Sequence, residues 1–437
     1  MPMLDSAPAS WGNYPKAHHD CVPVSDRRSP LPRVRGSLLP YGLGRSYGDS
    51  CLNDGNTLLL TRGLDHWISF DAQTGILQCE AGVSLAEILQ FASPQGWFLS
   101  VTPGTRYVTV GGAIANDVHG KNHHQAGTFG NSVLSFELLR SDGSRILCSR
   151  TENARLFRAT VGGLGLTGLI TQATLQLKPI VSPLIDSEQI RMANLSDFFA
   201  LADETHDRFE YCVAWLDGMA RGEKIGSGIF IRGNHVSTPS DLTWKEPPAL
   251  PVPVFAPSWF LGKPLVKAFN YAYARKFRGD RHQGQEHFLP FFYPLDVANN
   301  WNRAYGKRGF FQYQCVVPRE GNGGPIREIL EMISASGQGS FLNVLKVFGD
   351  QKPEGLLSFP RPGVTLAIDF PNRGQETLRL MSSLDEIVMK NGGALYAAKD
   401  ARMRREDFEQ FTPALDEFVK QIDPAFSSSF WRRVAPL

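Results

Sequence analysis

The sequence predicts an α+β protein built from two domains. Its 437 residues are more than one hydrophobic core usually holds. Glycine-rich stretches and short strands fill roughly the first 180 residues, whereas strands alternate with helices after Pro179. Because strand and helix segments follow one another in this second half, we expect an α+β domain there that binds with one face of its sheet.

The composition limits the possible classes of function. Hydrophobic residues make up 42% and charged residues 20% of the chain, as in globular proteins. The formal net charge of +2 is too balanced to favour nucleic acid or an acidic membrane as a partner. The six cysteines are dispersed without a CxxC pair, which fits reduced thiols in a cytoplasmic chain and provides no metal-ligand spacing. We predict no metal site, no membrane span and no secretion signal.

Local patterns predict the elements of the first domain. Short β-prone runs with turn signals between them predict strands at 57–61, 67–71 and 76–82. Ser84 and Glu87 form a capping box that opens a helix, and Pro94 ends it. Segments 133–141 and 145–149 flank an Asp–Gly turn and predict a hairpin, and a short helix follows at 155–160.

The glycine-rich stretch 102–131 is the clearest indication of a binding site. Glycine lets a backbone amide approach another group closely, so the stretch suits a phosphate-bearing cofactor or a closely packed backbone. A tight turn between strands is the alternative. His119, Lys121 and the segment 122–124 follow the glycines directly, a density of polar groups that a turn does not require. We therefore expect a cofactor here.

Two further glycine clusters, at 42–48 and 162–168, could be mistaken for a dinucleotide-binding fingerprint. The first has the spacing GxGxxxG, and the second matches GxGxxG from Gly163. A Rossmann site needs a helix directly after the glycines, because the helix N-terminus holds the pyrophosphate. Both clusters are instead followed by segments that predict strands. The sequence therefore excludes a Rossmann nicotinamide enzyme.

The second domain contains three strands with polar residues at alternate positions. These strands are expected at 310–317, 341–349 and 363–371, with helices at 325–336 and 375–391. Gln312 and Gln314 share one face, and Lys346 is the single charge of its strand. A binding face and a solvated sheet face explain these residues equally well. The chain is expected to end with a strand that leads into Lys399 and a helix over 405–422.

Residues 236–265 contain many prolines and are not expected to form regular structure. Loops of this length are usually functional or disordered, so we expect a surface excursion over the site. Its aromatic residues, among them Trp244, Trp259 and Phe260, suggest a mobile gate with an apolar side that meets lipid. The alternative is that these side chains fold back onto the second domain.

Three motifs, read together, resemble the vanillyl-alcohol oxidase/p-cresol methylhydroxylase superfamily of FAD-binding oxidoreductases. They are GLGRSYGD at 42–49, the stretch 103–131, and TVGGLGLTG at 160–168. Within the superfamily the sequence is most similar to the decaprenylphosphoryl-β-D-ribose 2′-oxidase family. That similarity extends over nearly the whole chain and includes WNRAYG at 301–306 and SFPRPG at 358–363.

The resemblance implies a two-domain PCMH/VAO-type fold with a split FAD domain. Residues 1–182 and 394–437 would form the FAD domain, and residues 183–393 a substrate-binding cap with an antiparallel sheet. Because Gly44–Arg45–Ser46 lacks the histidine of covalent relatives, FAD should be bound non-covalently. The FAD contacts implied are Tyr41, Gly42, Leu43, Gly44, Arg45, Ser46, Tyr47, Gly48, Asp49, Ser50, Gly104, Thr109, Val110, Gly111, Gly112, Asn116, Asp117, Val118, His119, Gly165, Ile170 and Tyr396.

The resemblance also implies an alcohol oxidoreductase that converts a secondary alcohol of a sugar or polyol to a ketone by hydride transfer to flavin N5. Lys399 would stabilise the reduced flavin, and His119 would either orient its loop or transfer a proton. Lys121 would help to hold an anionic substrate. The residues nominated for chemistry are Lys399, His119, Lys121, Gln314, Gln312 and Lys346.

The resemblance leaves the substrate and the partners open. Family members typically carry Asn and Cys where this chain has Thr365 and Ala367, so a small soluble polyol or aldonolactone is an alternative to a polyprenyl-phosphate-linked pentose. A non-catalytic flavin-binding subunit is a second alternative, although the polar cap residues speak against it. A short-chain reductase partner and a peripheral contact with the inner membrane are further expectations for a cytoplasmic protein.

Overall fold

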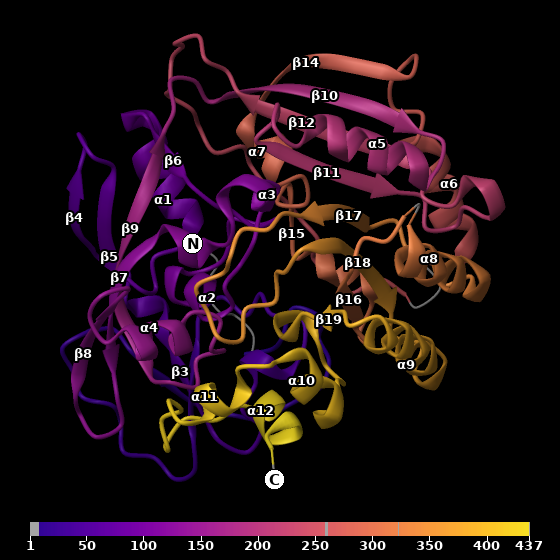
Figure 1. Cartoon of the computed structure of the whole chain (residues 1–437). Coiled ribbons are helices and arrows are strands. Elements are labelled where there is room, and N and C mark those ends of the chain that lie inside the picture. Colours follow the sequence, from indigo (N-terminus) through magenta and orange to yellow (C-terminus); the bar gives the residue numbers. More distant parts are fainter. Residues whose placement is uncertain (1–7, 258–260, 322, 437) are drawn as a thin grey trace.

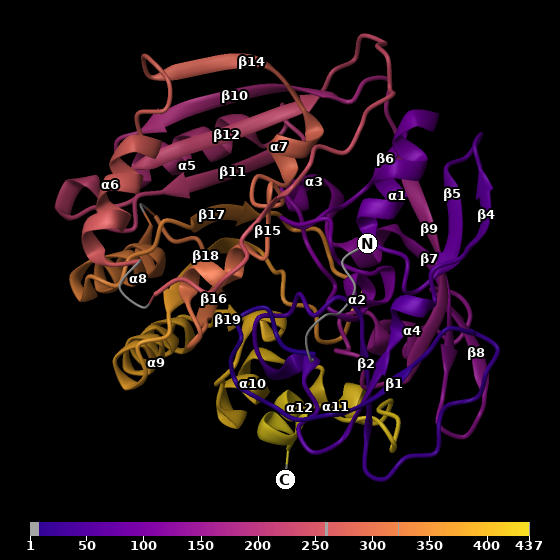
Figure 2. The ribbon, with the colours of Figure 1, turned by 180° about the vertical axis from the view of Figure 1, so that it is seen from behind.

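The two halves of the chain form separate sheets that meet along one junction (Figure 1). The structure is a computed structural model that describes all residues except 1–7, 258–260, 322 and 437. The chain passes from the first half to the second between β9, which ends at Pro179, and β10, which begins at Leu184. The C-terminal helices then return beneath both halves (Figure 2).

The first half contains a small parallel sheet and a larger antiparallel one. The parallel sheet has the order β1-β3-β2, and the antiparallel sheet has the order β4-β5-β9-β7-β8, with β6 paired to β9. The strands are β1 (Asp20–Pro23), β2 (Leu38–Tyr41), β3 (Thr57–Leu60), β4 (Trp67–Asp71), β5 (Ile76–Glu80), β6 (Trp97–Leu99), β7 (Val133–Leu139), β8 (Arg145–Ser149) and β9 (Leu169–Pro179). The helices are α1 (Leu85–Ala92), α2 (Val110–Ala115), α3 (His123–Ala126) and α4 (Ala154–Thr160).

The second half, the cap, is built on an eight-stranded antiparallel sheet of order β14-β10-β12-β11-β17-β18-β16-β19. Its strands are β10 (Leu184–Met192), β11 (Tyr211–Leu216), β12 (Gly228–His235), β14 (Arg281–His287), β16 (Phe310–Val317), β17 (Asn343–Phe348), β18 (Gly363–Pro371) and β19 (Ala394–Leu395). The helices are α5 (Leu195–Thr205), α6 (Lys263–Tyr273), α7 (Phe288–Phe292), α8 (Gly324–Ser336) and α9 (Gln375–Lys390). The helices α5, α8 and α9 bury their apolar sides against this sheet in one core (Figure 1), which leaves the opposite face of the central strands for other contacts.

The hydrophobic cores extend across the boundary between the halves. One core joins Leu164 of the first half to Phe311 of the cap and to Phe418 and Phe430 of the C-terminal segment. This segment contains α10 (Arg405–Phe411), α11 (Leu415–Val419) and α12 (Ser429–Val434). A second core joins the α1 region to Phe292 of the cap. Because each core draws on distant parts of the chain, we expect the halves to be held as one unit.

Most elements expected from local patterns are present. The capping box at Ser84 and Glu87 is formed in full, with α1 ending where Pro94 follows. The hairpin, the short helix α4 and the three polar-faced cap strands lie within two residues of their expected bounds. A strand, β9, follows the glycines at 162–168, so the exclusion of a Rossmann unit is confirmed.

Other expectations were wrong. The helix expected over 405–422 is divided into α10 and α11, because Pro413 lies in its middle and cannot donate a helical hydrogen bond. The expected strand leading into Lys399 stops at Leu395, in the cap sheet, and a short 3₁₀ turn (Ala397–Lys399) follows. The edge strand β14 went unnoticed because its sequence, RHQGQEH, has no apolar alternation.

The proline-rich segment 236–265 forms more structure than expected. β13 (Leu250–Pro251) pairs in parallel with β15 (Ala298–Asn299), and the N–H groups that bond belong to Leu250 and Val252, so Pro251 needs none. Residues 263–265 already belong to α6, where Pro264 occupies the first turn. Trp259 and Phe260 lie outside the described residues. The gate itself stays a prediction.

Two side-chain contacts fasten the proline-rich segment to the first half. The Trp244 indole donates to Ser93 Oγ at 2.6 Å, and Glu246 accepts from Arg106 at 2.7 Å. Among the described residues, no helix is long and apolar enough to cross a membrane.

Candidate active site

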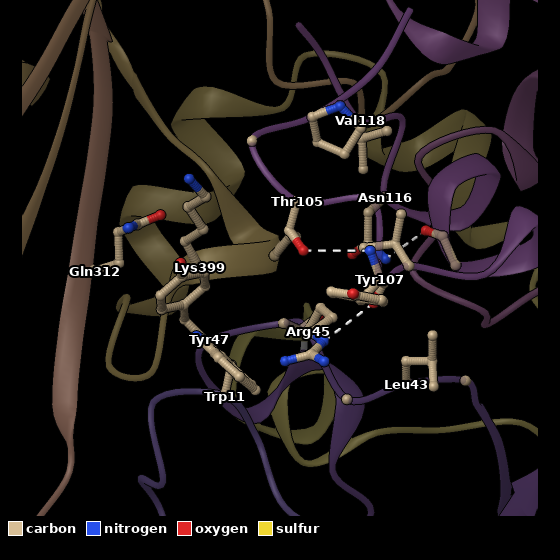
Figure 3. A pocket seen from close by; sticks show the side chains of 18 of the residues that line it. Trp11, Leu43, Arg45, Tyr47, Thr105, Tyr107, Asn116, Val118, Gln312 and Lys399 are labelled. Carbon is tan, nitrogen blue, oxygen red and sulfur yellow. Dashed lines mark hydrogen bonds between the residues drawn. The ribbon is translucent and has the colours of Figure 1, made fainter. Parts of the chain in front are cut away.

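A cavity of about 670 Å³ lies where the first half, the cap and the segment 396–399 meet. Figure 3 shows Lys399 and Gln312 on one side of it, with Asn116 and Val118 on the other. All six residues nominated for chemistry line this cavity: Lys399, His119, Lys121, Gln314, Gln312 and Lys346. The structure therefore brings together side chains that are up to 280 positions apart in the sequence.

The loop after β2 presents unused backbone donors to the cavity. The N–H groups of residues 43–46 have no acceptor among the described residues, and all four residues line the cavity. Gly44 has φ +62°, a left-handed conformation that lets neighbouring N–H groups converge on one point. A Cβ on Gly42 would collide with the Thr109 side chain, so glycine is needed for the loop to lie against the next element. This arrangement suits a phosphate group.

That next element is α2, which belongs to the glycine-rich stretch. Thr109 caps it, because its Oγ1 accepts from the Gly112 N–H at 3.1 Å. At the other end of α2, the Tyr396 hydroxyl donates to the Asn116 carbonyl at 2.8 Å. The C-terminal segment is thereby fastened to the first half at the edge of the cavity.

Most of the expected FAD contacts line the cavity, and four of the residues with a predicted role do not: Gly48, Asp49, Val110 and Asp117. Gly48 packs against the Asp400 carbonyl, and Asp49 pairs with Arg433 at 2.7 Å. Val110 is fully buried, and Asp117 accepts from the Gly130 N–H at 2.9 Å. These four residues support the loops from behind. Those that line the cavity are Tyr41, Gly42, Leu43, Gly44, Arg45, Ser46, Tyr47, Ser50, Gly104, Thr109, Gly111, Gly112, Asn116, Val118, His119, Gly165, Ile170 and Tyr396.

The cap contributes two neighbouring strands whose polar side chains face the cavity. In the antiparallel register of β16 and β18, Gln312 lies opposite Asp369 and Gln314 opposite Ala367. Side chains two residues apart share a face of a strand, so both glutamines point the same way. Gln314 Nε2 donates to His119 Nε2 at 3.0 Å, a contact that joins the cap to the glycine-rich stretch.

Asp369 lies on the same face of the sheet, fully buried beside Gln312, and orients the Gln312 side chain. Its carboxylate accepts from Gln312 Nε2 at 2.6 Å and from the Tyr305 hydroxyl at 3.0 Å. Burial raises the pKa of Asp369 to about 7, against the lowering effect of these two hydrogen bonds and of Lys399. The Gln312 Oε1 has no partner among the described residues, so it is the atom left to accept a bond from a ligand. The solvated-face alternative is excluded for Gln312 and Gln314, because both side chains are buried.

Three lysines surround the cavity without an ion-pair partner among the described residues. Burial lowers the pKa of Lys121 to about 8 and that of Lys399 to about 8, each partly offset by a carboxylate. Burial lowers the pKa of Lys346 to about 7, with the charges of Lys399 and Lys121 adding to the effect. Lys346 Nζ donates to the Gly120 carbonyl at 2.9 Å. Unpaired cations in a partly dehydrated cavity favour an anionic ligand.

His119 is neutral in this arrangement. Burial lowers the pKa of His119 well below its usual value, and the charges of Lys346 and Lys399 lower it further. Its Nε2 accepts from Gln314, so the ring proton lies on Nδ1. A neutral imidazole with so low a pKa is a weak base, which favours an orienting function over proton transfer.

Several cavity residues were not anticipated. Trp11 lies over the Arg45 guanidinium, 3.9 Å from ring centroid to Cζ, and the Arg45 Nε donates to the Tyr107 carbonyl at 3.0 Å. The cap adds a set of aromatic residues: Trp215, Phe269, Tyr273, Phe292, Trp301 and Phe341. In the sequence these aromatic residues could not be told from ordinary core residues, because their spacing matches no motif.

Comparison with known proteins identifies the family. Residues 33–149 match a family model described as an FAD binding domain. Decaprenylphosphoryl-beta-D-ribose oxidase of Mycolicibacterium smegmatis is 38% identical over 91% of this chain and 89% of its own length. The chain belongs to this family of FAD-dependent oxidoreductases.

Two other relatives lie further away. A protein of Streptomyces coelicolor named only by its position, in the mprA 5′ region, is 34% identical over 80% of this chain and the whole of its own length. Mouse L-gulonolactone oxidase is 24% identical over 97% of the flavoprotein described here and 96% of its own length.

The cavity residues fit FAD, the cofactor of this flavoprotein family. The free N–H groups of residues 43–46 can bind the pyrophosphate without a helix dipole. Lys399 adds a cation to the wall of the same cavity. Mixed polar and aromatic walls suit the large ring system.

We predict that FAD is released intact when the protein is denatured. Among the described residues that line the cavity, His119 is the only histidine and Cys51 the only cysteine. The imidazole is engaged by Gln314, and burial raises the pKa of the Cys51 thiol to about 12, so neither is a ready nucleophile. Acid precipitation should leave the yellow colour in the supernatant, whereas a yellow pellet would show a covalent bond.

A second prediction concerns Asp369. Asp369→Asn removes a negative charge that raises the pKa of Lys399, so the alkaline limb of the pH profile for flavin reduction should move to lower pH. A loosened Gln312 should also slow reduction by up to about a hundredfold. Stopped-flow measurement between pH 6 and 10 tests both effects.

Tyr305→Phe is the control for Asp369→Asn, because it removes a hydrogen bond to the same carboxylate but keeps the charge. Its alkaline limb should stay in place. If both variants shift the limb equally, or neither does, Asp369 does not tune Lys399.

Proposed function

We propose that this flavoprotein oxidises a secondary hydroxyl of a sugar that carries a lipid-linked phosphate. The observation that carries the proposal is the group of three lysines, Lys121, Lys346 and Lys399, which face one cavity without a carboxylate within ion-pair distance among the described residues. Such a site gains electrostatic free energy when it binds an anion. The name of the mycobacterial relative describes a substrate of this kind, a phosphate-linked ribose.

The three lysines divide into two functions. Lys121 adjoins Gly120, whose carbonyl accepts from Lys346 Nζ at 2.9 Å, so we assign these two lysines to the substrate phosphate. Lys399 lies beside the Tyr47 and Tyr396 rings, 5.5 and 6.0 Å from their centroids, and its charge also lowers the pKa of Lys346. Lys399 is therefore the cation that stabilises negative charge on the cofactor.

When bound, FAD supplies the hydride acceptor for the alcohol carbon. The chain's own residues hold the alcohol in place. Gln312 Oε1 and Gln314 Oε1 have no partner among the described residues and can accept bonds from sugar hydroxyls. The hydroxyl proton leaves to water or to a basic side chain as the ketone forms. His119 holds Gln314 in position.

The wall formed by β18 sets this chain apart from typical family members. Thr365 accepts from Gln314 Nε2 at 3.1 Å, and Ala367 lines the cavity without a polar group. An alanine cannot act as a nucleophile or a hydrogen-bond partner, so the proposed chemistry does not use this position. We infer that Ala367 leaves additional room beside the sugar.

The proposal is tested by anaerobic reduction of the bound flavin. We expect a prenyl-phosphoryl ribose to bleach the flavin absorbance near 450 nm at low concentration, and free ribose to do so only weakly. L-Gulonolactone tests the alternative suggested by the more distant mouse relative. Faster bleaching by the lactone than by the phosphate-linked sugar would replace the proposed substrate with a small soluble alcohol.

Lys399→Ala should abolish substrate-dependent flavin reduction while FAD stays bound. Losing a cation aimed at developing negative charge costs about 3–4 kcal/mol of transition-state stabilisation, or a factor of several hundred in rate. Stopped-flow absorbance measures the rate, and the ratio of flavin to protein absorbance measures cofactor content. Lys352→Ala, at an exposed position, is the matched control. Near-normal reduction in a yellow Lys399→Ala protein would contradict this function.

The affinity for a phosphate-linked sugar should fall as the pH rises. Because the pKa of Lys346 is about 7, its charge is present below pH 7 and is lost above it. The dissociation constant should therefore increase between pH 7 and 9, and Lys346→Arg, which remains charged, should flatten the profile. A neutral sugar alcohol serves as the control ligand. An equally steep profile for the neutral ligand would exclude Lys346 as the cause.

A further inference from the structure

The helix α6 (Lys263–Tyr273) turns mostly apolar side chains toward the solvent. Its buried line is formed by Val266 and Asn270. Helix geometry of about 100° per residue places most of the other described side chains on the outward side, whereas Tyr273 packs against Trp215. The exposed positions are Pro264, Leu265, Lys267, Ala268, Phe269, Tyr271 and Ala272, and all of them except Lys267 form an apolar arc of about 160°. Surface helices normally turn a polar face outward.

Further exposed apolar residues lie on chain segments next to the cavity of the candidate active site. Leu250 is 72% exposed and bonds through its N–H to the carbonyl of Val297, which is 55% exposed. Seven of the eleven large hydrophobic residues that are exposed in the described chain lie between positions 250 and 297. They are Leu250, Val254, Phe255, Leu265, Phe269, Tyr271 and Val297. Such a concentration of exposed apolar side chains indicates a binding surface.

Basic residues accompany the outward side of α6. Residues 263–281 carry six Lys or Arg and one acidic residue, a net charge of +5 in a chain whose total is only +2. Lys267, Arg275, Lys276 and Arg278 are all exposed or nearly so. An apolar face edged by basic residues is the pattern of a helix that lies in the surface of a membrane.

We propose that α6 docks this protein onto an anionic lipid bilayer, next to the cavity that its residues Phe269 and Tyr273 line. The net charge of residues 263–281 favours an anionic bilayer over a second copy of the chain as the partner. A two-fold interface through α6 would bring together two surfaces that each carry a net charge of +5. The apolar arc matches the acyl region, and the basic residues match anionic headgroups.

The position of α6 links docking to the cavity. Phe269 and Tyr273 of α6 line it, as do Trp301 and Asn299, whose carbonyl accepts from the Val252 N–H. A lipid-linked sugar could then reach the cavity from the bilayer without its tail crossing water. This link rests on the proposed function, whereas the docking itself does not.

Vesicle flotation of the full-length FAD-loaded protein tests the docking. Vesicles of phosphatidylcholine and phosphatidylglycerol at 3:1 should carry the protein, and pure phosphatidylcholine should carry at least tenfold less. Leu265→Asp should reduce binding at least tenfold, since Leu265 does not line the cavity. Leu147→Asp is the matched control, because Leu147 on β8 is 46% exposed and Leu265 is 44% exposed. A combined Lys267→Glu and Arg278→Glu variant tests the charge.

The outcomes separate docking from the proposed function. Docking is supported if Leu265→Asp loses vesicle binding but reduces its flavin normally with a short-chain prenyl-phosphoryl ribose in solution. It is overturned if wild-type protein does not float with anionic vesicles, or if Leu265→Asp binds as Leu147→Asp does. It is also overturned if α6 proves to mediate self-association in sedimentation, without vesicle binding. Failure of the short-chain sugar to reduce wild-type flavin contradicts the proposed function alone.

Discussion

Three lysines without a carboxylate at ion-pair distance among the described residues create the electrostatic constraint around which this protein is arranged. Lys121 comes from the glycine-rich stretch, Lys346 from β17 of the cap and Lys399 from the C-terminal segment. A partly dehydrated lysine lowers the stability of the empty protein, as the lowered pKa values of all three show. The cores shared between the halves hold these side chains together, and an anionic ligand relieves their repulsion.

The strand register of the cap sheet decides which polar side chains face the cavity. Antiparallel pairing of β16 with β18 places Gln312 beside Asp369, and the same register places Gln314 beside Ala367. A slip of one residue would turn these side chains into the hydrophobic core on the other face of the sheet. The Gln314–His119 contact then fixes the sheet to the first half. Orientation of polar groups in the cavity thus depends on packing that is purely structural.

The balance of charge over the whole chain conceals a local imbalance. A total of +2 is too balanced to favour an acidic membrane as a partner, yet residues 263–281 alone carry +5. Only the structure shows that these charges accompany a helix whose outward side is mostly apolar and whose residues Phe269 and Tyr273 line the cavity. Electrostatic attraction acts over about 10 Å, so local density matters more than the total.

The sequence by itself determined the local elements, the glycine loops and the family, because caps, turns and glycine spacing act within a few residues. It also nominated the six chemistry residues that line the cavity. The tertiary structure decided what depends on distant partners: the neutral state of His119, the Asp369 contact that orients Gln312, and the aromatic walls. It also showed that Gly48, Asp49, Val110 and Asp117 do not line the cavity but lie behind the loops. Burial and contact arise only when segments hundreds of residues apart pack together, so no local pattern encodes them.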